Sequence, residues 1–195
     1  MVNLAEHPVL IVRQEVEHIE AFTGFETENR YSLATPDGDT LLYAAEESGF
    51  LGRNLLKSHR PLTLKAVDPQ GHVVFEASRN FFWFFSHMHI RDSARPLGSL
   101  RRHFGLLVRK FTLEDSTGRE VAEIRGPQLR PNTFMVYRQG SEIARITKQW
   151  SGILKEAFTD ADTFRVELND RQMEPDLALL ILTAAFAIDL DFFES

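Results

Sequence analysis

Residues 177–188 read Leu-Ala-Leu-Leu-Ile-Leu-Thr-Ala-Ala-Phe-Ala-Ile, and this stretch decides the fold. Pro175 and Asp176 precede it and are typical of the first turn of a helix. A helix that is apolar on every side must be surrounded by protein or by lipid. About 12 apolar residues span only ~18 Å at a rise of ~1.5 Å per residue, against a hydrocarbon core of ~30 Å. The pattern therefore predicts a buried central helix over about 175–188, with a membrane span as the alternative.

Short turn signals separate runs of β-branched and aromatic residues along the rest of the chain. These connectors lie at residues 36–39, 69–71, 116–118 and 139–140. Connectors of this kind are the signature of hairpins. Between two of them, Leu62, Leu64 and Ala66 alternate with Thr63 and Lys65, as in a strand with one buried face. We therefore expect one mainly β domain over residues 1–195, a closed barrel around the helix. Such a barrel needs more strands than the eight that side chains alone can fill.

The composition excludes several classes of protein. Apolar residues make up 43% and charged residues 26% of the 195 residues, which is ordinary for a globular chain and excludes a disordered or collagen-like one. The formal net charge of -6 argues against nucleic acid as a partner. The absence of cysteine excludes disulfides, thiol catalysis and cysteine-based zinc sites. The N-terminus, MVNLAEHPVLIVRQE, lacks the pattern of a secretory signal. We therefore expect a protein that is not secreted and lies in the cytoplasm, free or peripheral at the inner face of the membrane.

Three segments carry a family resemblance. Residues 146–164 read ITKQWSGILKEAFTDADTF and form the most specific of the three. The others are residues 10–47, with Thr-Gly-Phe-Glu-Thr at 23–27, and the tail 188–195. All three resemble the phospholipid scramblase family, and the likeness runs from about Pro8 to Ser195. It implies a tubby-like fold of the LURP-one-related superfamily. That fold is a mainly β, 12-stranded antiparallel barrel that encloses a hydrophobic C-terminal α-helix.

The sequence departs from the family pattern at two places. Animal members carry Cys-rich stretches, one of which is a lipidation site. The matching residues here are 49–56 and 80–86, and neither stretch contains cysteine. Attachment of a fatty acid to cysteine is therefore excluded, and aromatic and aliphatic side chains occupy both regions.

Motifs of covalent catalysis are not found in the sequence. It contains no GxSxG, HExxH, P-loop or GxGxxG motif, so we do not expect an enzyme. The resemblance implies a phospholipid scramblase-like, membrane-associated protein for lipid translocation or lipid binding. The alternative is a soluble tubby-like module without scrambling activity that binds anionic phospholipid headgroups or a protein partner. A closed barrel gives a headgroup no polar route through ~30 Å of hydrocarbon, which favours the alternative as a mechanism.

Acidic residues in and after the central segment raise the question of calcium as a cofactor. The resemblance implies a Ca²⁺ site here, and carboxylate oxygens suit this ion. The EF-hand template fits poorly, because Arg165 replaces the turn glycine and Arg171 replaces the bidentate glutamate. Weak Ca²⁺ binding and a plain acidic turn before a strand both stay open. The candidate ligands are Asp160, Asp162, Glu167 and Asp170.

Aromatic and basic residues supply the candidates for contact with an anionic phospholipid membrane. Residues 81–85 are five consecutive aromatics, and neighbours on a strand point to opposite sides, so some of them need cover. Cover within the molecule and contact with a bilayer are the two interpretations. The basic residues lie on solvated faces or bind headgroups. The candidates are Arg53, Lys57, Arg60, Phe82, Trp83, Phe84, Arg101 and Arg102.

Two further predictions concern the core and a pair of histidines. We expect Trp150 in the central segment, and Leu180 and Ala184 in the predicted helix, to lie in the core. His87 and His89 would share one face of a strand. A metal site needs three or four ligands, and no third ligand lies nearby in the sequence, so we interpret both as ordinary histidines.

Overall fold

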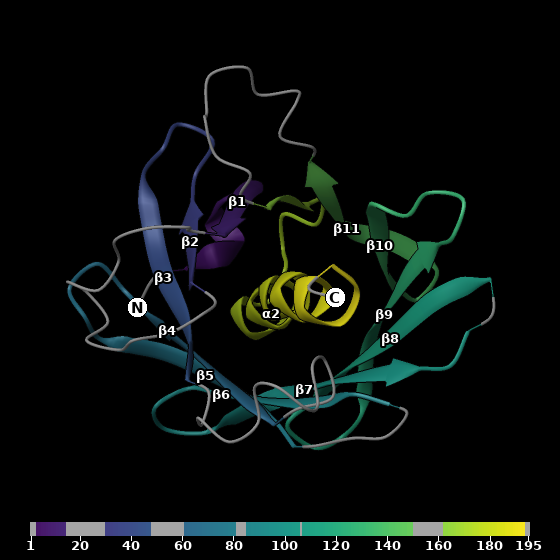
Figure 1. Cartoon of the computed structure of the whole chain (residues 1–195), viewed down its shortest axis with the longest axis horizontal. Coiled ribbons are helices and arrows are strands. Elements are labelled where there is room, and N and C mark those ends of the chain that lie inside the picture. Colours follow the sequence, from purple (N-terminus) through teal and green to yellow (C-terminus); the bar gives the residue numbers. More distant parts are fainter. Residues whose placement is uncertain are drawn as a thin grey trace.

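The computed structural model describes residues 3–14, 30–47, 61–80, 85–105, 107–149 and 162–193. Twelve strands close into a barrel, and one C-terminal helix, α2, lies inside the ring of strands (Figure 1). This confirms the predicted fold class. A short 3-10 helix, η1 (Leu4–Glu6), precedes the barrel. The strands are β1 (Val9–Gln14), β2 (Arg30–Ala34), β3 (Thr40–Glu47), β4 (Leu62–Val67), β5 (Val73–Arg79), β6 (His87–Arg91), β7 (Pro96–His103), β8 (Val108–Asp115), β9 (Glu120–Pro127), β10 (Thr133–Arg138), β11 (Ser141–Gln149) and β12 (Thr163–Leu168).

The barrel closes where the first strand pairs with the last. In that antiparallel pairing Leu10 of β1 lies opposite Val166 of β12. On the other side of β1, Val12 lies opposite Leu33 of β2. All four side chains are buried. Closure leaves no unpaired sheet edge at this seam, so the apolar side chains of all twelve strands can face one core.

The predicted hairpin turns are confirmed. Gly118 joins β8 to β9 with a φ of 82°, a conformation that glycine adopts without steric cost. The Asp115 carboxylate stabilises this turn, because it accepts hydrogen bonds from the backbone N–H groups of Thr117 (2.9 Å) and Arg119 (3.1 Å). Between β10 and β11 the turn residues Gln139 and Gly140 have φ values of 51° and 84°, as a two-residue hairpin requires.

Helix α2 (Pro175–Phe192) is longer than the apolar run predicts. It continues past Ile188 through Asp189 and Asp191, both of which are enclosed by polar partners described below. Leu180 and Ala184 are buried inside the barrel. Within the described ranges, no helix is both long enough and apolar enough to cross a membrane.

The helix comes closest to the wall at β7. A Cβ atom at Gly98 would lie 2.1 Å from the carbonyl oxygen of Glu114 and 3.1 Å from Cδ1 of Leu180. Real Cβ atoms do not approach a backbone oxygen as closely as 2.1 Å, so glycine at this position lets β7 pair with β8. The contact with Leu180 would be tight but not forbidden. Leu100 on the same strand is buried in the core.

The two ends of the barrel differ in what they carry. The antiparallel order brings the last residues of β1, β3, β5, β7, β9 and β11 to one end, and α2 also ends there. We call this the Phe192 end. The helix begins at the opposite end, which we call the Pro175 end, where the tight hairpin turns lie.

Candidate functional site at one end of the barrel

A buried ion pair fixes the end of α2 to the barrel wall. Nη1 of Arg79, at the end of β5, lies 2.5 Å from Oδ1 of Asp191, and both side chains are buried. Nη1 of Arg102 on β7 lies 3.7 Å from Oδ2 of the same carboxylate. One aspartate therefore faces two arginines from two different strands.

Two arginines also stack on the ring of Phe192. The guanidinium carbon of Arg102 is 4.4 Å from the ring centroid, and that of Arg109 on β8 is 5.1 Å from it. Arg109 also lies over Phe134 at 4.2 Å and donates a 2.5 Å hydrogen bond to the carbonyl oxygen of Pro131. In the described part of the chain no carboxylate forms an ion pair with Arg109. Its burial and the charge of Arg102 both lower its pKa.

A second polar group lies near the last turn of the helix. The carboxylate of Asp189 is buried and accepts a 2.9 Å hydrogen bond from the Tyr31 hydroxyl. Burial raises the pKa of Asp189 to about 6, although the Tyr31 hydrogen bond acts in the opposite direction. Asp162 raises this pKa further, and Nζ of Lys148 lies 2.5 Å from Asp162 Oδ2. The same lysine lies over the Phe193 ring at 3.8 Å.

Exposed apolar side chains gather at the same end of the barrel. Among the described residues, all five exposed large hydrophobics flank the connections from β5 to β6, β7 to β8 and β9 to β10. They are Phe85 (49% exposed), Phe104 (78%), Leu107 (74%), Val108 (37%) and Leu129 (98%). Scattered single hydrophobics are normal on a surface, but here all five lie at the same end of the barrel, which makes that end the more apolar one among the described residues.

A pocket lies at the rim between these apolar residues and the arginines. Its volume is about 380 Å³, and it is lined by Phe85, Ser86, His87, Arg101, Arg102, His103 and Phe104. The backbone N–H of Arg102 donates a 2.8 Å hydrogen bond to the carbonyl oxygen of Ser86. This bond joins β7 to the segment before β6, and both residues line the pocket. We call this hollow the rim pocket.

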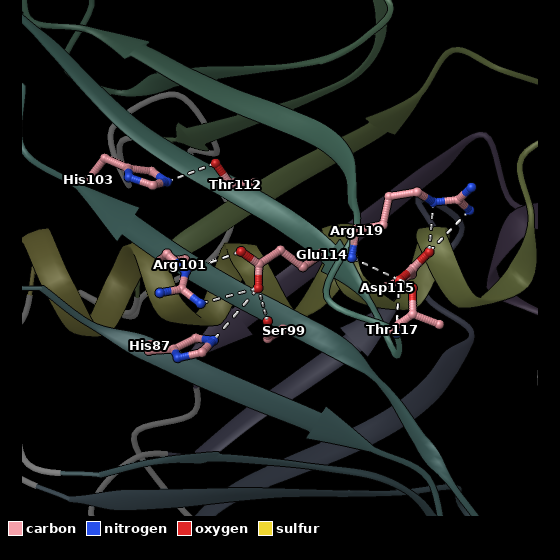
Figure 2. Close-up of polar contacts among 9 residues, drawn as sticks. All are labelled: His87, Ser99, Arg101, His103, Thr112, Glu114, Asp115, Thr117 and Arg119. Atoms are coloured by element: carbon pink, nitrogen blue, oxygen red, sulfur yellow. Dashed lines mark hydrogen bonds and ion pairs between the residues drawn. The ribbon is translucent and has the colours of Figure 1, made fainter.

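Outside the wall, Glu114 of β8 organises a polar cluster with residues of β6 and β7 (Figure 2). Its carboxylate accepts hydrogen bonds from Ser99 Oγ at 2.9 Å and Arg101 Nε at 3.1 Å. His87 Nε2 lies 3.9 Å from Glu114 Oε2. Burial raises the pKa of Glu114, but the hydrogen bonds from Arg101 and Ser99 hold it below its ordinary value.

His87 and His89 lie on the same face of β6, as the alternation predicts, with ring centroids 4.2 Å apart. Burial lowers the pKa of His87, and the charges of His89 and Arg101 lower it further, against the opposing charge of Glu114. Glu114 is the neighbour that the sequence did not reveal, because it is two strands away. No group of three His, Cys, Asp or Glu residues within the described ranges could hold a metal ion.

The structure separates the described candidate ligands for Ca²⁺. Asp162 lies at the Phe192 end and pairs with Lys148. Glu167 pairs with Arg165, with Oε1 3.1 Å from Nε. Asp170 lies beyond the other end of β12, with Oδ2 2.6 Å from Nη2 of Arg138. Calcium binding therefore stays a prediction.

Of the predicted membrane contacts, the structure places Arg101 on the outer wall and Arg102 at the rim. The other predicted membrane contacts, one predicted core residue and one predicted Ca²⁺ ligand lie outside the described residues. They are Arg53, Lys57, Arg60, Phe82, Trp83, Phe84, Trp150 and Asp160. Sequence reasoning missed Arg79, for which the available signal was a basic residue at the end of an alternating apolar strand.

The Pro175 end has a larger hollow of about 640 Å³, but its arginines are paired with carboxylates. Arg138 contacts Asp170 and Glu174. Outside the hollow, Arg95 donates from both Nη atoms to the carboxylate of Asp176, which lines it, at 2.9 Å each. Among the described residues, the exposed large hydrophobics all lie at the Phe192 end, where Arg109 also forms no ion pair with a carboxylate. The Pro175 end is therefore the weaker candidate for a surface that binds an anionic membrane.

The sequence model of the family described as Scramblase matches residues 1–195. The chain belongs to the Scramblase family. It is 30% identical over 206 residues to phospholipid scramblase 1 of Mus musculus, and this alignment covers 98% of the chain and 62% of the mouse protein. It is 28% identical to phospholipid scramblase 2 of Homo sapiens, over 98% of the chain and 69% of the human protein.

The Scramblase family likeness extends to fungi. Altered inheritance rate of mitochondria protein 25 of Saccharomyces cerevisiae is 22% identical over 98% of this chain and 72% of its own length. The chain spans less than two thirds of the mouse, rat and human scramblase 1 proteins, at 62%, 59% and 65% of their lengths. For this chain, the activity of those longer proteins is therefore a proposal.

Proposed function

We propose that this protein is a membrane-associated, phospholipid scramblase-like protein that binds an anionic phospholipid surface through its Phe192 end. The observation that carries the proposal is the gathering of exposed apolar side chains and arginines at that end. Family membership over the whole chain and the names of its relatives support a phospholipid as the ligand. No covalent chemistry is part of the proposal.

Apolar and basic residues contribute to membrane binding in different ways. Phe104, Leu107 and Leu129 would enter the interfacial region of the bilayer and bury apolar area there. Arg101 and Arg102 would meet anionic headgroups, at roughly 1 kcal/mol per charge near the surface. The inner face of the membrane, where anionic lipids are concentrated, is the expected location.

The packing of α2 bears on how lipids could be moved. The helix fills the barrel with buried side chains such as Leu180 and Ala184, so a headgroup path through the interior would require the helix to leave. We therefore propose that the protein acts on the leaflet from its surface. The same packing favours a second candidate function, lipid binding without translocation.

Reconstitution in liposomes separates the two functions. Liposomes carry fluorescent lipids in both leaflets, and dithionite bleaches only those in the outer leaflet. Scrambling would bleach the signal beyond the outer-leaflet share, and the assay is run with and without Ca²⁺. An unchanged outer-leaflet share, together with retained binding to the vesicles, would leave lipid binding as the function.

Co-sedimentation with anionic vesicles tests the binding surface itself. We expect Phe104→Ser with Leu107→Ser to weaken binding, because both side chains are exposed at the Phe192 end. Val73→Ser, at a half-buried position at the start of β5 at the Pro175 end, is the control and should bind like the wild type. Equal binding by both variants would contradict the assignment of this end.

A further inference from the structure

The rim pocket has a composition that suits an amphipathic ligand. Its two aromatic residues, Phe85 and Phe104, are exposed at 49% and 78%. Between them lie four groups that are cationic or can become so. These are Arg101, Arg102, His87 and His103. None of the described residues that line the pocket is a carboxylate.

Both arginines of the pocket are held in place before any ligand arrives. Arg102 lies over Phe192 at 4.4 Å, and its charge is shared with Asp191, which already pairs with Arg79. Arg101 is oriented by the carboxylate of Glu114 on the outer wall. Pre-organised guanidinium groups lose little freedom when they bind a planar or tetrahedral anion.

His87 adds a polar atom that is not satisfied. Its Nε2 atom is buried, and it makes no hydrogen bond within the described part of the chain. Buried polar atoms without a partner are uncommon in native proteins. Glu114 Oε2 lies 3.9 Å from this atom, too far for a hydrogen bond, and the His87 ring lines the rim pocket, where an acceptor oxygen of a ligand would be the partner.

We propose that the rim pocket binds the phosphate of a phospholipid headgroup, with Arg101 and Arg102 as charged donors and His87 as a further donor. The proposal rests on the proposed function, since it names the ligand group that this end of the barrel recognises. Arginine forks match phosphate oxygens in pairs, which supplies the specificity. Phe85 and Phe104 flank the anion site and contact the glycerol and acyl part of the lipid. A free phosphate lacks these apolar contacts and should bind more weakly.

Binding is coupled to the protonation of His87. The groups that face this ring are His89 on its own strand, Arg101 on β7 and Glu114 on β8, while the register on the β5 side places uncharged Ser78 opposite His89. Burial, His89 and Arg101 disfavour the imidazolium in the free protein. A phosphate anion in the pocket favours it, so the complex takes up a proton and tightens as the pH falls.

Calorimetric titration with dihexanoyl-phosphatidylglycerol, kept monomeric, tests the pocket without a membrane. Glycerol phosphate and inorganic phosphate are the comparison ligands. Arg102→Gln and Arg101→Gln should each weaken binding of the short-chain lipid by about tenfold, as for a lost charge-assisted contact. Arg145→Gln on β11 removes one charge that pairs with Glu142, and this control should bind like the wild type. Binding should be tighter at about pH 6 than at about pH 8, and His87→Gln should reduce this difference more than His103→Gln does.

Three results would overturn the proposal. They are no binding of the short-chain lipid by the wild type, binding by both arginine variants that is as tight as that of the wild type, or binding of inorganic phosphate by the wild type that is as tight as its binding of the short-chain lipid. Far-UV circular dichroism checks that each variant is folded. If Arg102→Gln is not folded, Arg101→Gln and the His ring signals of the wild type in NMR titration still decide the question. Co-sedimentation with phosphatidylserine vesicles is measured in parallel. If the short-chain lipid binds but vesicles do not, the proposed function is wrong and the pocket assignment stands. If vesicles bind but the short-chain lipid does not, only the pocket assignment is wrong.

Discussion

Arg79 at the end of β5 and Asp191 in the last turn of α2 form an ion pair inside the barrel, with Nη1 and Oδ1 2.5 Å apart and both side chains 1% exposed. The two residues are 112 positions apart in the sequence. Burial of two charges is costly, and close pairing only offsets this cost. The pair therefore fixes where the helix end lies more than it adds net stability, and it holds Phe192 beneath the arginines of the rim.

Replacing one residue of this pair should lower the free energy of unfolding far more than replacing both. Arg79→Met leaves Asp191 buried with a weaker partner, and we expect a loss of roughly 3–5 kcal/mol in the free energy of unfolding. The double variant Arg79→Met with Asp191→Leu should recover most of that loss. Urea unfolding of the wild type, both single variants and the double variant forms the cycle. Additive losses in the double variant would contradict this account.

Asp189 should make the protein less stable as the pH rises. Its folded-state pKa is raised to about 6 from an ordinary value of 3.8, so the native state binds a proton more tightly than the unfolded state does. The stabilising contribution is therefore complete below about pH 4 and is lost as the pH rises through about 6. Asp189→Asn keeps an acceptor for Tyr31 and cannot ionise. We expect it to gain roughly 2 kcal/mol over the wild type between about pH 4 and pH 8.

Thermal unfolding across that pH range measures the difference between Asp189→Asn and the wild type. The comparison has to be a difference between the two proteins, because other carboxylates change stability with pH in both. The pKa of Asp115, for example, is lowered to about 2, chiefly by the Thr117 hydroxyl, so its contribution to stability increases as the pH rises. A difference that does not vary with pH would show that Asp189 ionises normally.

The centre of the helix should not tolerate charge. Leu180→Asp or Ala184→Asp places a carboxylate among apolar side chains without a partner, at a cost of several kcal/mol. We expect loss of the folded protein, seen as insoluble expression and loss of the cooperative thermal transition. Leu129→Asp, at a position that is 98% exposed, is the control and should fold like the wild type. A folded Leu180→Asp would mean that the helix is not held inside the barrel.

The sequence predicts the helix and the hairpins because both depend on local patterns. Residues 177–188 are apolar throughout, and turns such as Gln139-Gly140 are local as well. The extension of the helix to Phe192 could not be predicted, because Asp189 and Asp191 look like a polar stop until Tyr31 and Arg79 are found across the barrel. Those partners lie 158 and 112 positions away, and no local rule connects them.

The candidate site was predicted only in part, for a similar reason. Arg101 and Arg102 are adjacent, so strand alternation predicts that they face opposite sides. Which side faces the core depends on the register of β7 with β8, where Arg102 lies opposite the buried Phe111. The exposed residues Phe104 and Leu129 follow strand ends, and their shared position at one end emerges only from the closed topology.

Calcium at micromolar concentration should not bind measurably. Asp162 already pairs with Lys148 at 2.5 Å, and Asp170 pairs with Arg138 at the far end of β12. A Ca²⁺ ion needs six or more oxygen ligands, so it would have to displace Lys148 and find most of its ligands elsewhere. Calorimetric titration of the metal-free protein should give no micromolar isotherm. A micromolar site that disappears in Asp160→Ala or Asp162→Ala would reverse this conclusion.

Salt should weaken the part of membrane binding that depends on Arg101 and Arg102, and leave the apolar part unchanged. Screening shortens the Debye length from ~10 Å at about 0.1 M salt to ~3 Å at about 1 M, while apolar insertion is not weakened by screening. Phe104→Ser with Leu107→Ser should therefore lower binding to phosphatidylserine vesicles at every salt concentration and leave the slope against salt unchanged. Arg101→Gln with Arg102→Gln should lower binding at low salt and flatten the slope. Parallel slopes for the wild type and the arginine variant would show that charges other than those at the rim attract the membrane.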